Sequence, residues 1–309
     1  MIVRSGSWES WAPVDRETSV TIGVLDGVHL GHQRLLSRLD SDLMMTVLTF
    51  DPHPIEVLRP GTPPRLITTV EERIERFAAL GVDCVGVLDL AEIREQSPET
   101  FVSHVLVDRF RVGQLVVGED FRFGHDRSGD VSLLRTLSHS HDFALDIVEL
   151  VTDGGDVVSS SRIRALVEAG KVDEAAELLG TWFSLTGEVT HGDKRGRELG
   201  FPTANLKPPR RKLIPANGVY ACLADVDGET HWAAVNVGVR PTFGGDELLV
   251  EAFLLGFDSE IYGKEITVRF VEHLRPELEF SSVDALVDQM AADVEETREI
   301  LTNLPAVAG

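Results

Sequence analysis

The strongest constraint on the fold is a change in the rhythm of apolar segments along the chain. In residues 1–180, short apolar runs alternate with segments of helical periodicity. After residue 180 the apolar runs follow one another through turns, and only Val283–Leu301 has a long helical pattern. The first rhythm predicts a mostly parallel sheet covered by helices, and the second predicts an antiparallel β-barrel with one C-terminal helix. We therefore expect two domains, 1–180 and 181–309, joined near Gly180–Phe183.

The same patterns give approximate bounds for the elements. The strands expected in the first domain are Val20–Leu25, Met44–Phe50, Val82–Leu88, Leu115–Val117 and Phe143–Val148. The helices expected there are Gln33–Leu39, Val70–Leu80, Pro98–Phe110, Val131–Leu137 and Arg162–Leu179, the last interrupted at Gly170. The strands expected in the second domain are Leu185–Thr190, Val219–Val226, Trp232–Val237, Leu248–Leu255 and Ile266–Phe270.

Composition limits the partners of the chain. Its 309 residues carry a net charge of −22, and the acidic residues are spread over both halves. This charge argues against binding to nucleic acid or to an anionic membrane, which requires a basic face.

No segment is apolar enough to cross a bilayer, and Met1–Val20 has no signal-peptide core. With two distant cysteines in apolar runs, Cys84 and Cys222, we expect free thiols and a cytoplasmic setting. No pattern specifies whether the chain forms homo-oligomers.

The densest chemical signal lies between Gly23 and His32, where a predicted strand runs into a glycine-rich turn and a helix begins. His29 and His32 are spaced to project from one side of the first helical turn. Imidazoles there can donate hydrogen bonds to phosphate oxygens as charge builds up during phosphoryl transfer. Gly31 leaves room for the backbone to approach phosphates. The alternative is an ordinary strand–helix turn with two surface histidines.

Three later segments of the first domain also follow predicted strands or begin a helix. In 159–164, serines and the two arginines Arg162 and Arg164 form a suitable clamp for a triphosphate, although helix capping alone would explain the serines. Phe121 and Phe123 offer rings that could stack on a planar ligand, or they form a buried aromatic pair. The segment 49–54 presents a histidine between two prolines, which a structural turn would also explain.

The second domain begins with a basic, glycine-rich segment, 192–205. The loop that begins at Gly192 and carries Lys194 and Arg197 could fold over phosphates. The Thr203 hydroxyl and the Asn205 carboxamide are hard ligands suited to Mg²⁺. A basic surface hairpin is the alternative reading of this composition.

A single acidic residue, Glu251, lies within a predicted strand of the same domain. Strand alternation points its carboxylate to one face, where it could take a proton from a substrate hydroxyl. An exposed strand glutamate is the alternative interpretation.

These segments match one family in order along nearly the whole chain. The first domain resembles the H-x-G-H nucleotidyltransferases, specifically the FMN-adenylylating module of prokaryotic bifunctional riboflavin kinase/FAD synthetases. The second resembles their riboflavin kinase module, whose signature ends Gly-Phe-Pro-Thr-Ala-Asn, as 200–205 does here. Leu25 stands where the family usually has phenylalanine, and we expect it to pack beneath the turn.

The resemblance implies fold, reactions and residue roles. It implies a Rossmann-like α/β domain that adenylylates FMN to FAD, and a barrel domain that phosphorylates riboflavin to FMN, both with ATP and Mg²⁺. Glu251, His29 and His32 would be catalytic, and Thr203 and Asn205 would contact magnesium. The residues implied to bind ATP or its phosphates are Gly23, Asp26, Gly31, Ser160, Arg162, Arg164, Gly192, Lys194 and Arg197. Those implied to bind the flavin are Phe50, Pro54, Asp120, Phe121 and Phe123.

Two other functions remain open at this point. A lone adenylyltransferase for another substrate, such as a nicotinate or pantetheine phosphate, would explain His29 and His32 but leave Thr203, Asn205 and Glu251 without a purpose. A flavin-binding protein with inactive sites would have lost reactive residues, whereas both sets are present here. The expected partners are therefore small molecules: riboflavin, FMN and ATP.

Overall fold

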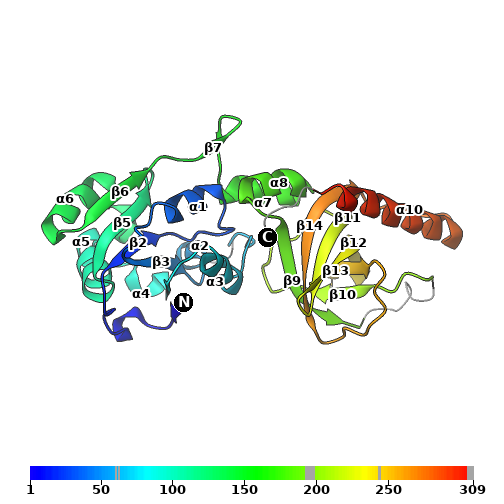
Figure 1. The fold of residues 1–309 in the computed structure, drawn as a ribbon, viewed down its shortest axis with the longest axis horizontal. Coiled ribbons are helices and arrows are strands. Elements are labelled where there is room, and N and C mark those ends of the chain that lie inside the picture. Colours follow the sequence, from blue (N-terminus) through cyan, green and yellow to red (C-terminus); the bar gives the residue numbers. More distant parts are fainter. Residues whose placement is uncertain (60, 62, 192–198, 243–244, 305–309) are drawn as a thin grey trace. The chain divides into compact units, whose positions relative to one another are not determined.

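The structure is a computed structural model that describes residues 1–59, 61, 63–191, 199–242 and 245–304. It contains two compact units, which meet in the sequence between Ser160 and Ser161 (Figure 1). The division lies N-terminal to the predicted join near Gly180. The helices α7 (Ser160–Glu168) and α8 (Val172–Leu179) consequently belong to the second unit, apart from the first residue of α7.

The first unit contains a six-stranded sheet in the order β1-β4-β3-β2-β5-β6, and every neighbouring pair is parallel. Its strands are β1 (Ile2–Arg4), β2 (Thr18–Ile22), β3 (Met44–Phe50), β4 (Cys84–Leu88), β5 (Val112–Gly118) and β6 (Ala144–Val148). Its main helices are α1 (Leu30–Leu36), α2 (Pro54–Leu58), α3 (Val70–Ala79), α4 (Leu90–Ile93), α5 (Pro98–Phe101), the π-helical segment η2 (Val102–Arg109) and α6 (Val131–His141). The short elements η1 (Trp8–Ser10), η3 (His125–Arg127), β7 (Thr152–Asp153) and β8 (Asp156–Val157) complete it. The predicted α/β class is confirmed.

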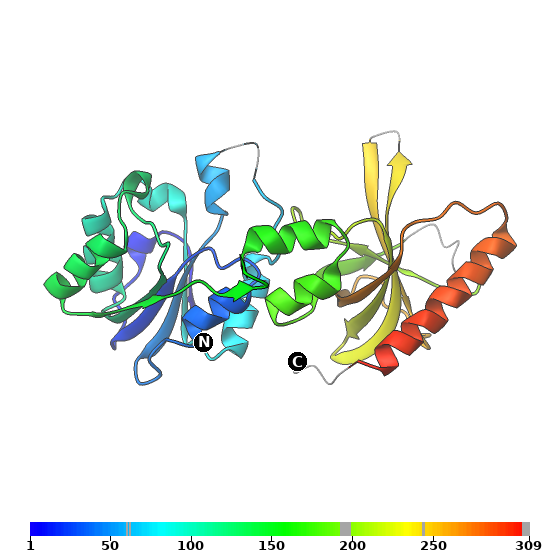
Figure 2. The same ribbon diagram turned by 90° about the horizontal axis from the view of Figure 1, so that it is seen from above.

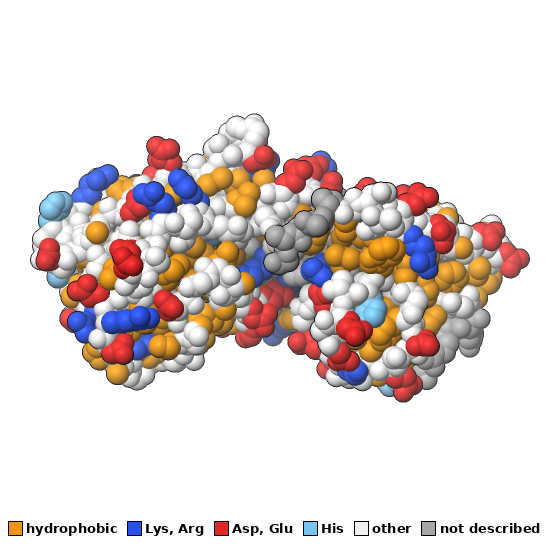
Figure 3. Space-filling view, in the orientation of Figure 1, with side chains coloured by type: hydrophobic (Ala, Val, Ile, Leu, Met, Phe, Trp, Pro, Cys, Tyr) orange, Lys and Arg blue, Asp and Glu red, His pale blue; other side chains and the backbone are white. Residues whose placement is uncertain are grey.

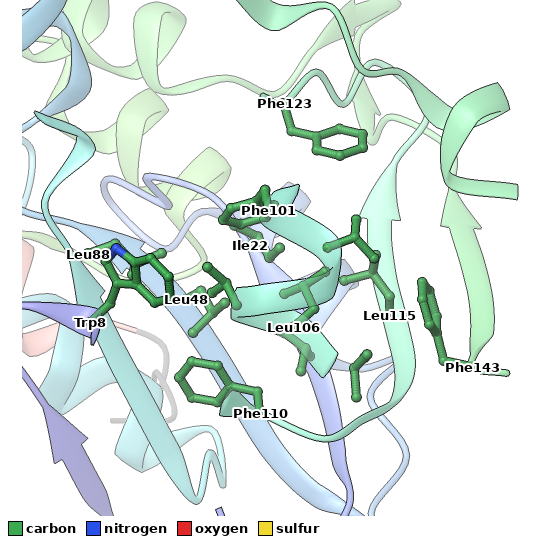
Figure 4. Packing of buried hydrophobic residues seen from close by; sticks show 14 of the residues in the cluster. Trp8, Ile22, Leu48, Leu88, Phe101, Leu106, Phe110, Leu115, Phe123 and Phe143 are labelled. Atoms are coloured by element: carbon green, nitrogen blue, oxygen red, sulfur yellow. The ribbon is translucent and has the colours of Figure 1, made fainter. Parts of the chain in front are cut away.

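Apolar residues on the central strands pack on both faces of this sheet. In β5, Leu115 and Val117 belong to one core cluster, and Val116 between them belongs to a second. Because successive side chains of a strand point to opposite faces, the two clusters lie on the two sides of the sheet. Figure 4 shows the first of them, with Phe110 beside Leu48 and Leu106. Burial on both faces explains why these strands read as continuous apolar runs.

The second unit contains a closed antiparallel barrel of six strands in the order β10-β13-β12-β11-β14-β9. The strands are β9 (Phe183–Thr190), β10 (Ala204–Lys207), β11 (Gly218–Val226), β12 (Glu229–Thr242), β13 (Gly245–Leu254) and β14 (Glu265–Arg275). The long helix α10 (Val283–Thr302) packs against β11, β12 and β14, and Figure 2 shows it alongside the barrel in red. The predicted barrel with a C-terminal helix is confirmed.

Helices α7 and α8 cover another part of the barrel. α8 contacts β9 and β14, and the buried faces of the two helices include Val167, Val172 and Leu179, each 0 % exposed. The Ala216 N–H donates a hydrogen bond to the Val167 carbonyl at 3.3 Å. These helices therefore cover apolar surface of the barrel unit. The predicted join near Gly180 would have placed them in the other domain.

We expect a fragment of residues 161–309 to be markedly more stable than one of residues 181–309. Cutting at 181 removes side chains whose burial is worth about 1.5–3 kcal/mol each, and it exposes the barrel residues beneath them. Thermal melting followed by circular dichroism checks this comparison. Equal melting temperatures would show that α7 and α8 contribute nothing to the barrel's stability.

Candidate active sites

The turn after β2 places two histidines side by side. Leu25 and Val28 have positive φ values of 53° and 44°, so the chain reverses sharply before α1. Leu25 is 4 % exposed and packs in the core beneath the turn, as predicted. The rings of His29 and His32 stack with centroids 3.5 Å apart and planes 23° apart. The pair thus forms one unit at the end of β2.

Gly31 is required by this stacked pair. A Cβ atom at Gly31 would lie 3.0 Å from Cε1 and 3.1 Å from Nδ1 of His29. A larger residue would therefore crowd the His29 ring, which would have to shift by a few tenths of an ångström. The structure therefore adds a reason for the glycine, because it makes room for an imidazole as well as for phosphate.

The protonation of His32 is biased toward the neutral form. Burial lowers the pKa of His32 well below its ordinary value, and the positive charges of His29 and Arg73 lower it further. At neutral pH His32 is therefore an uncharged imidazole, which can still donate one N–H hydrogen bond. Two stacked imidazoles also resist carrying two charges at once.

Asp26 anchors the turn from below. It is 1 % exposed, and its carboxylate accepts hydrogen bonds from the Ile67 N–H at 3.1 Å and from the Thr68 N–H and hydroxyl at 2.8 and 3.0 Å. Because these bonds occupy a buried carboxylate, the Asp26 side chain holds the turn in place, and its predicted contact with ATP stays a prediction. The Ser160 hydroxyl donates to the Asp26 carbonyl at 2.9 Å, which places Ser160 at the same turn.

The other predicted ligand-binding loops of the first unit follow neighbouring strands. β3 and β5 lie on either side of β2, so their carboxyl ends meet at one edge of the sheet (Figure 1). Phe50 and Pro54, at the end of β3 and the start of α2, are both half-buried. In such sheets ligands bind outside the carboxyl ends of the strands. The topology therefore brings these loops and the histidine turn to the same edge.

The loop after β5 contains Asp120, which is exposed, and a stacked aromatic pair. The rings of Phe121 and Phe123 lie 5.6 Å apart at 14°. Phe123 is 7 % exposed and packs against Phe101, so it is the structural member of the pair. Phe121 is the more accessible ring.

At the start of α7, Arg162 and Arg164 lie on either side of Ile163. Both arginines are half-buried, whereas Ile163 is 0 % exposed. The two arginines therefore flank the buried position on the helix.

In the barrel, Glu251 occupies the middle of a row of polar residues. It pairs in register with Asn205 on β10 and with Asn236 on β12. Directly paired residues on adjacent strands point to the same face, so a carboxylate is flanked by two carboxamides. The neighbours Ala252 and Val237 are buried, which places the polar row on the other face of the sheet.

This row borders a cavity of about 440 Å³. Its lining combines aromatic and aliphatic side chains with a few polar ones: Leu199, Phe201, Thr203, Val219, Ala234, Asn236, Leu249, Glu251, Phe253, Arg275, Glu277, Leu278, Phe280, Leu286, Met290, Asp293 and Val294. The rings of Phe201 and Phe253 meet edge to face at 5.3 Å. Such a lining suits a planar, largely apolar ligand with one polar end.

A second cavity, of about 240 Å³, lies next to the first. It is lined by residues of β9, β10 and the segment after β13: Val189, Pro202, Thr203, Ala204, Leu254, Phe257, Asp258, Ser259, Glu260, Ile261 and Tyr262. Thr203 lines both cavities. Two ligands could therefore meet at this residue.

An ion pair fastens α10 to the barrel at the wall of the larger cavity. Arg275 donates to both carboxylate oxygens of Asp293, from Nε at 2.8 Å and from Nη2 at 2.7 Å. Gln289 donates to the same carboxylate at 2.9 Å. The Asp293 side chain is 5 % exposed and that of Arg275 is 16 % exposed, so the pair is shielded from water.

We expect Asp293→Ala to lower the melting temperature of the barrel unit and to raise the KM for its cavity ligand. Removing one member of a buried pair leaves an uncompensated charge, which costs about 3–5 kcal/mol. The double variant Arg275→Met with Asp293→Leu removes both charges and should be less destabilised. Thermal melting and steady-state kinetics check both variants. A double variant that is as unstable as the single one would contradict this account.

Three predicted phosphate-binding residues, Gly192, Lys194 and Arg197, lie outside the described residues. Sequence reasoning missed Asp293 and Arg73, both of which are buried. Arg73 could have been found as a charged residue four positions before the apolar Phe77, whereas Asp293 lies four positions from the polar Gln289 and Thr297, which give no such signal.

Comparison with known proteins agrees with this arrangement. A family model described as FAD synthetase matches residues 12–162, and one described as riboflavin kinase matches residues 179–301. The proteins named bifunctional riboflavin kinase/FMN adenylyltransferase from Listeria monocytogenes and Escherichia coli are 36 % identical to this chain. The match to the Listeria protein covers 96 % of this chain and 96 % of that protein. The match to the Escherichia coli protein covers 91 % of each.

A sheet unit with a histidine turn and a barrel unit with a glutamate row define a transferase with two catalytic units. The chain belongs to the bifunctional riboflavin kinase/FMN adenylyltransferase family, as its motifs predicted.

A solved structure shares the whole fold. A Streptococcus pneumoniae chain named a macrolide-efflux protein is 31 % identical, has a TM-score of 0.89, and covers 99 % of this chain and 100 % of its own length. The transport activity in that protein's name matches neither family model. Within the described ranges, no helix has both the length and the apolar character needed to cross a bilayer.

Proposed function

We propose that the two reactions of the family run in separate sites of this chain. The barrel unit transfers the γ-phosphoryl group of ATP to the terminal ribityl hydroxyl of riboflavin. The sheet unit then joins FMN to the AMP portion of a second ATP. The observation that carries the proposal is Glu251 in its polar row at the wall of an aromatic cavity, in a chain whose other unit holds the stacked histidine pair.

For the kinase step, the larger cavity receives the flavin ring and the smaller one receives ATP. The ribityl hydroxyl then lies near Thr203, where the cavities meet. Glu251 aligns this hydroxyl and takes its proton while the oxygen bonds to the γ-phosphorus. The bond between that phosphorus and the β–γ bridging oxygen breaks, and ADP leaves. Positioning and charge supply most of the catalysis in such transfers.

The donors near Thr203 fit a magnesium ion that arrives with ATP. The Thr203 hydroxyl and the Asn205 carboxamide offer the hard oxygen ligands that Mg²⁺ prefers. Among the described residues, no group of three or more His, Cys, Asp or Glu side chains could hold a metal. Mg²⁺ is usually held by a few protein oxygens together with phosphates and water, and it would neutralise charge on the ATP phosphates.

For the adenylylation step, the FMN phosphate attacks the α-phosphorus of ATP and pyrophosphate leaves. His29 and His32 donate hydrogen bonds to the phosphate oxygens, while Gly23 and Gly31 leave room for the chain to approach. Ser160, Arg162 and Arg164 hold the triphosphate. We assign the flavin ring to the edge formed by Phe50, Pro54, Asp120 and Phe121, with Phe123 supporting Phe121.

The remaining properties follow from charge and thiol state. Acidic side chains are scattered over the face shown in Figure 3, and the net charge of the chain is −22, which suits small-molecule substrates better than nucleic acid. Cys84 and Cys222 are free and buried, which suits the reducing cytoplasm. A single-activity adenylyltransferase is not favoured, because the family matches cover both units.

Incubating the purified chain with riboflavin, ATP and Mg²⁺, and separating the flavins by chromatography, tests the proposal. FMN should form first and FAD should follow. FAD formation only from supplied FMN would limit the chain to the adenylyltransferase, and unchanged riboflavin and FMN would mean a flavin-binding protein without activity.

A further inference from the structure

The buried face of α3 carries an arginine at its centre. Arg73 is 1 % exposed, and Phe77, one turn further along, is 0 % exposed. A guanidinium keeps its charge in proteins, and burying a charge is unfavourable unless partners compensate for it. The residues that receive its hydrogen bonds therefore indicate why the chain places an arginine there.

Those bonds join the ends of two neighbouring strands. Nη1 donates to the Val24 carbonyl, just after β2, at 2.5 Å and to the Thr49 hydroxyl on β3 at 2.9 Å. Nη2 donates to the carbonyl of Phe50, the last residue of β3, at 3.2 Å. The Thr49 hydroxyl itself donates to the Val24 carbonyl at 2.9 Å. One planar group thus spans both strand ends.

The surrounding charges stabilise this arrangement. Burial lowers the pKa of Arg73, but the carboxylates of Asp26, Asp51 and Glu71 oppose this effect. Arg76, on the same helix, donates from Nη1 to the Gly27 carbonyl at 2.9 Å. α3 therefore holds the histidine turn through both arginines, and Asp26 holds the residues just before α3 in return.

The two strand ends carry different parts of the first site. The histidine turn follows Val24, and the loop that ends at Pro54 follows Phe50. Their spacing fixes where the His29–His32 pair lies relative to a ligand at the end of β3. The strand ladder holds the two strands together as far as the Gly23 N–H to Leu48 carbonyl bond at 3.0 Å, and beyond it a shift in the spacing would move the histidines.

We propose that Arg73 is a positioning residue for adenylyl transfer, whose guanidinium sets the distance between the histidine turn and the loop after β3. The inference rests on the proposed function of the first site. Arginine is needed because its rigid fork reaches both strand ends at once. Lysine keeps the charge but offers one nitrogen, which could replace Nη1 at Val24 and Thr49 but not the additional bond from Nη2 to the Phe50 carbonyl.

The test uses the full chain with Arg73→Met and Arg73→Lys, and with Phe77→Leu as the matched control. Phe77 lies on the same buried face and belongs to the core, so Phe77→Leu weakens the packing of α3 while Arg73 stays in place. For each variant, kcat and the KM for ATP are measured for FAD formation from supplied FMN. The riboflavin phosphorylation rate and the melting temperature are measured alongside.

A small misplacement of catalytic groups can reduce a rate by about a hundredfold. We therefore expect Arg73→Met to lower the kcat of FAD formation by about that factor, with much less change in the KM for ATP. Arg73→Lys should fall between Arg73→Met and the unsubstituted chain. Phe77→Leu should retain most of its kcat at temperatures where it is folded, and all variants should keep riboflavin phosphorylation.

Two results would overturn the inference. One is a kcat for Arg73→Met no lower than that of Phe77→Leu at equal folded fraction, and the other is full activity in Arg73→Lys. If Arg73→Met fails to fold, Arg73→Lys decides the question by the same comparison. Absence of FAD formation in the unsubstituted chain would instead contradict the proposed function.

Discussion

Replacing Glu251 with glutamine is expected to reduce riboflavin phosphorylation by about two orders of magnitude or more, because general-base catalysis contributes about 10²- to 10⁴-fold. The carboxamide keeps the shape of the side chain in the row between Asn205 and Asn236 but cannot accept the substrate proton. FAD formation from supplied FMN should continue, since the histidine pair lies in the other unit. Chromatography of the flavin products measures both rates in one sample.

An exposed glutamate elsewhere on the barrel provides the matched control. Glu188 on β9 is exposed, and Glu188→Gln makes the same chemical change outside the cavity. It should leave both activities intact. If Glu251→Gln keeps a kinase rate within a few-fold of that of Glu188→Gln, then Glu251 has a structural role only.

Removing the histidine pair is expected to abolish FAD formation while riboflavin phosphorylation continues. Losing one hydrogen-bond donor to a transition-state oxyanion costs about 10²- to 10³-fold in kcat. Because the two rings stack on each other, His29→Ala also removes the support of His32. The double variant should therefore lose less than the two single losses combined.

His139→Ala, on the exposed side of α6, controls for the loss of a histidine from the same unit. Both reaction rates are followed by the same product chromatography. Unchanged FAD synthesis in the chain that lacks both His29 and His32 would remove the histidines from the mechanism.

Sequence patterns predicted the architecture well where burial of side chains produces the pattern. The strands at the centre of the first sheet are covered on both faces, so they appear as apolar runs, and Met44–Phe50 has the predicted bounds. β10 was not predicted, because its first two residues end a motif that was interpreted as a loop. Helix periodicity likewise could not show that α7 and α8 pack on the barrel, since that depends on contacts between distant segments.

The sites were predictable in their residues and less so in their geometry. The motif around Glu251 indicated a base on one face of a strand, but its pairing with Asn205 and Asn236 depends on strand register, which tertiary packing sets. Arg73 escaped notice because an arginine on a helix normally faces water. Asp26 was predicted to bind ATP from its place in a motif, whereas the hydrogen bonds that its buried carboxylate accepts depend on the folded turn.

Closure of the barrel has a consequence for synthesis of the protein on the ribosome. β9, the first strand of the barrel, pairs with the last, β14, from Glu188 with Glu265 to Phe183 with Phe270. The ring of strands cannot close until the chain has been made through β14, whereas every strand of the parallel sheet is complete by Val148. Domains generally fold as units, N-terminal first, during synthesis, and pairing of distant strands is slow. We therefore expect nascent chains to gain a protease-resistant sheet unit while β9 still has an unpaired edge, which is the interval in which chaperones would be most needed.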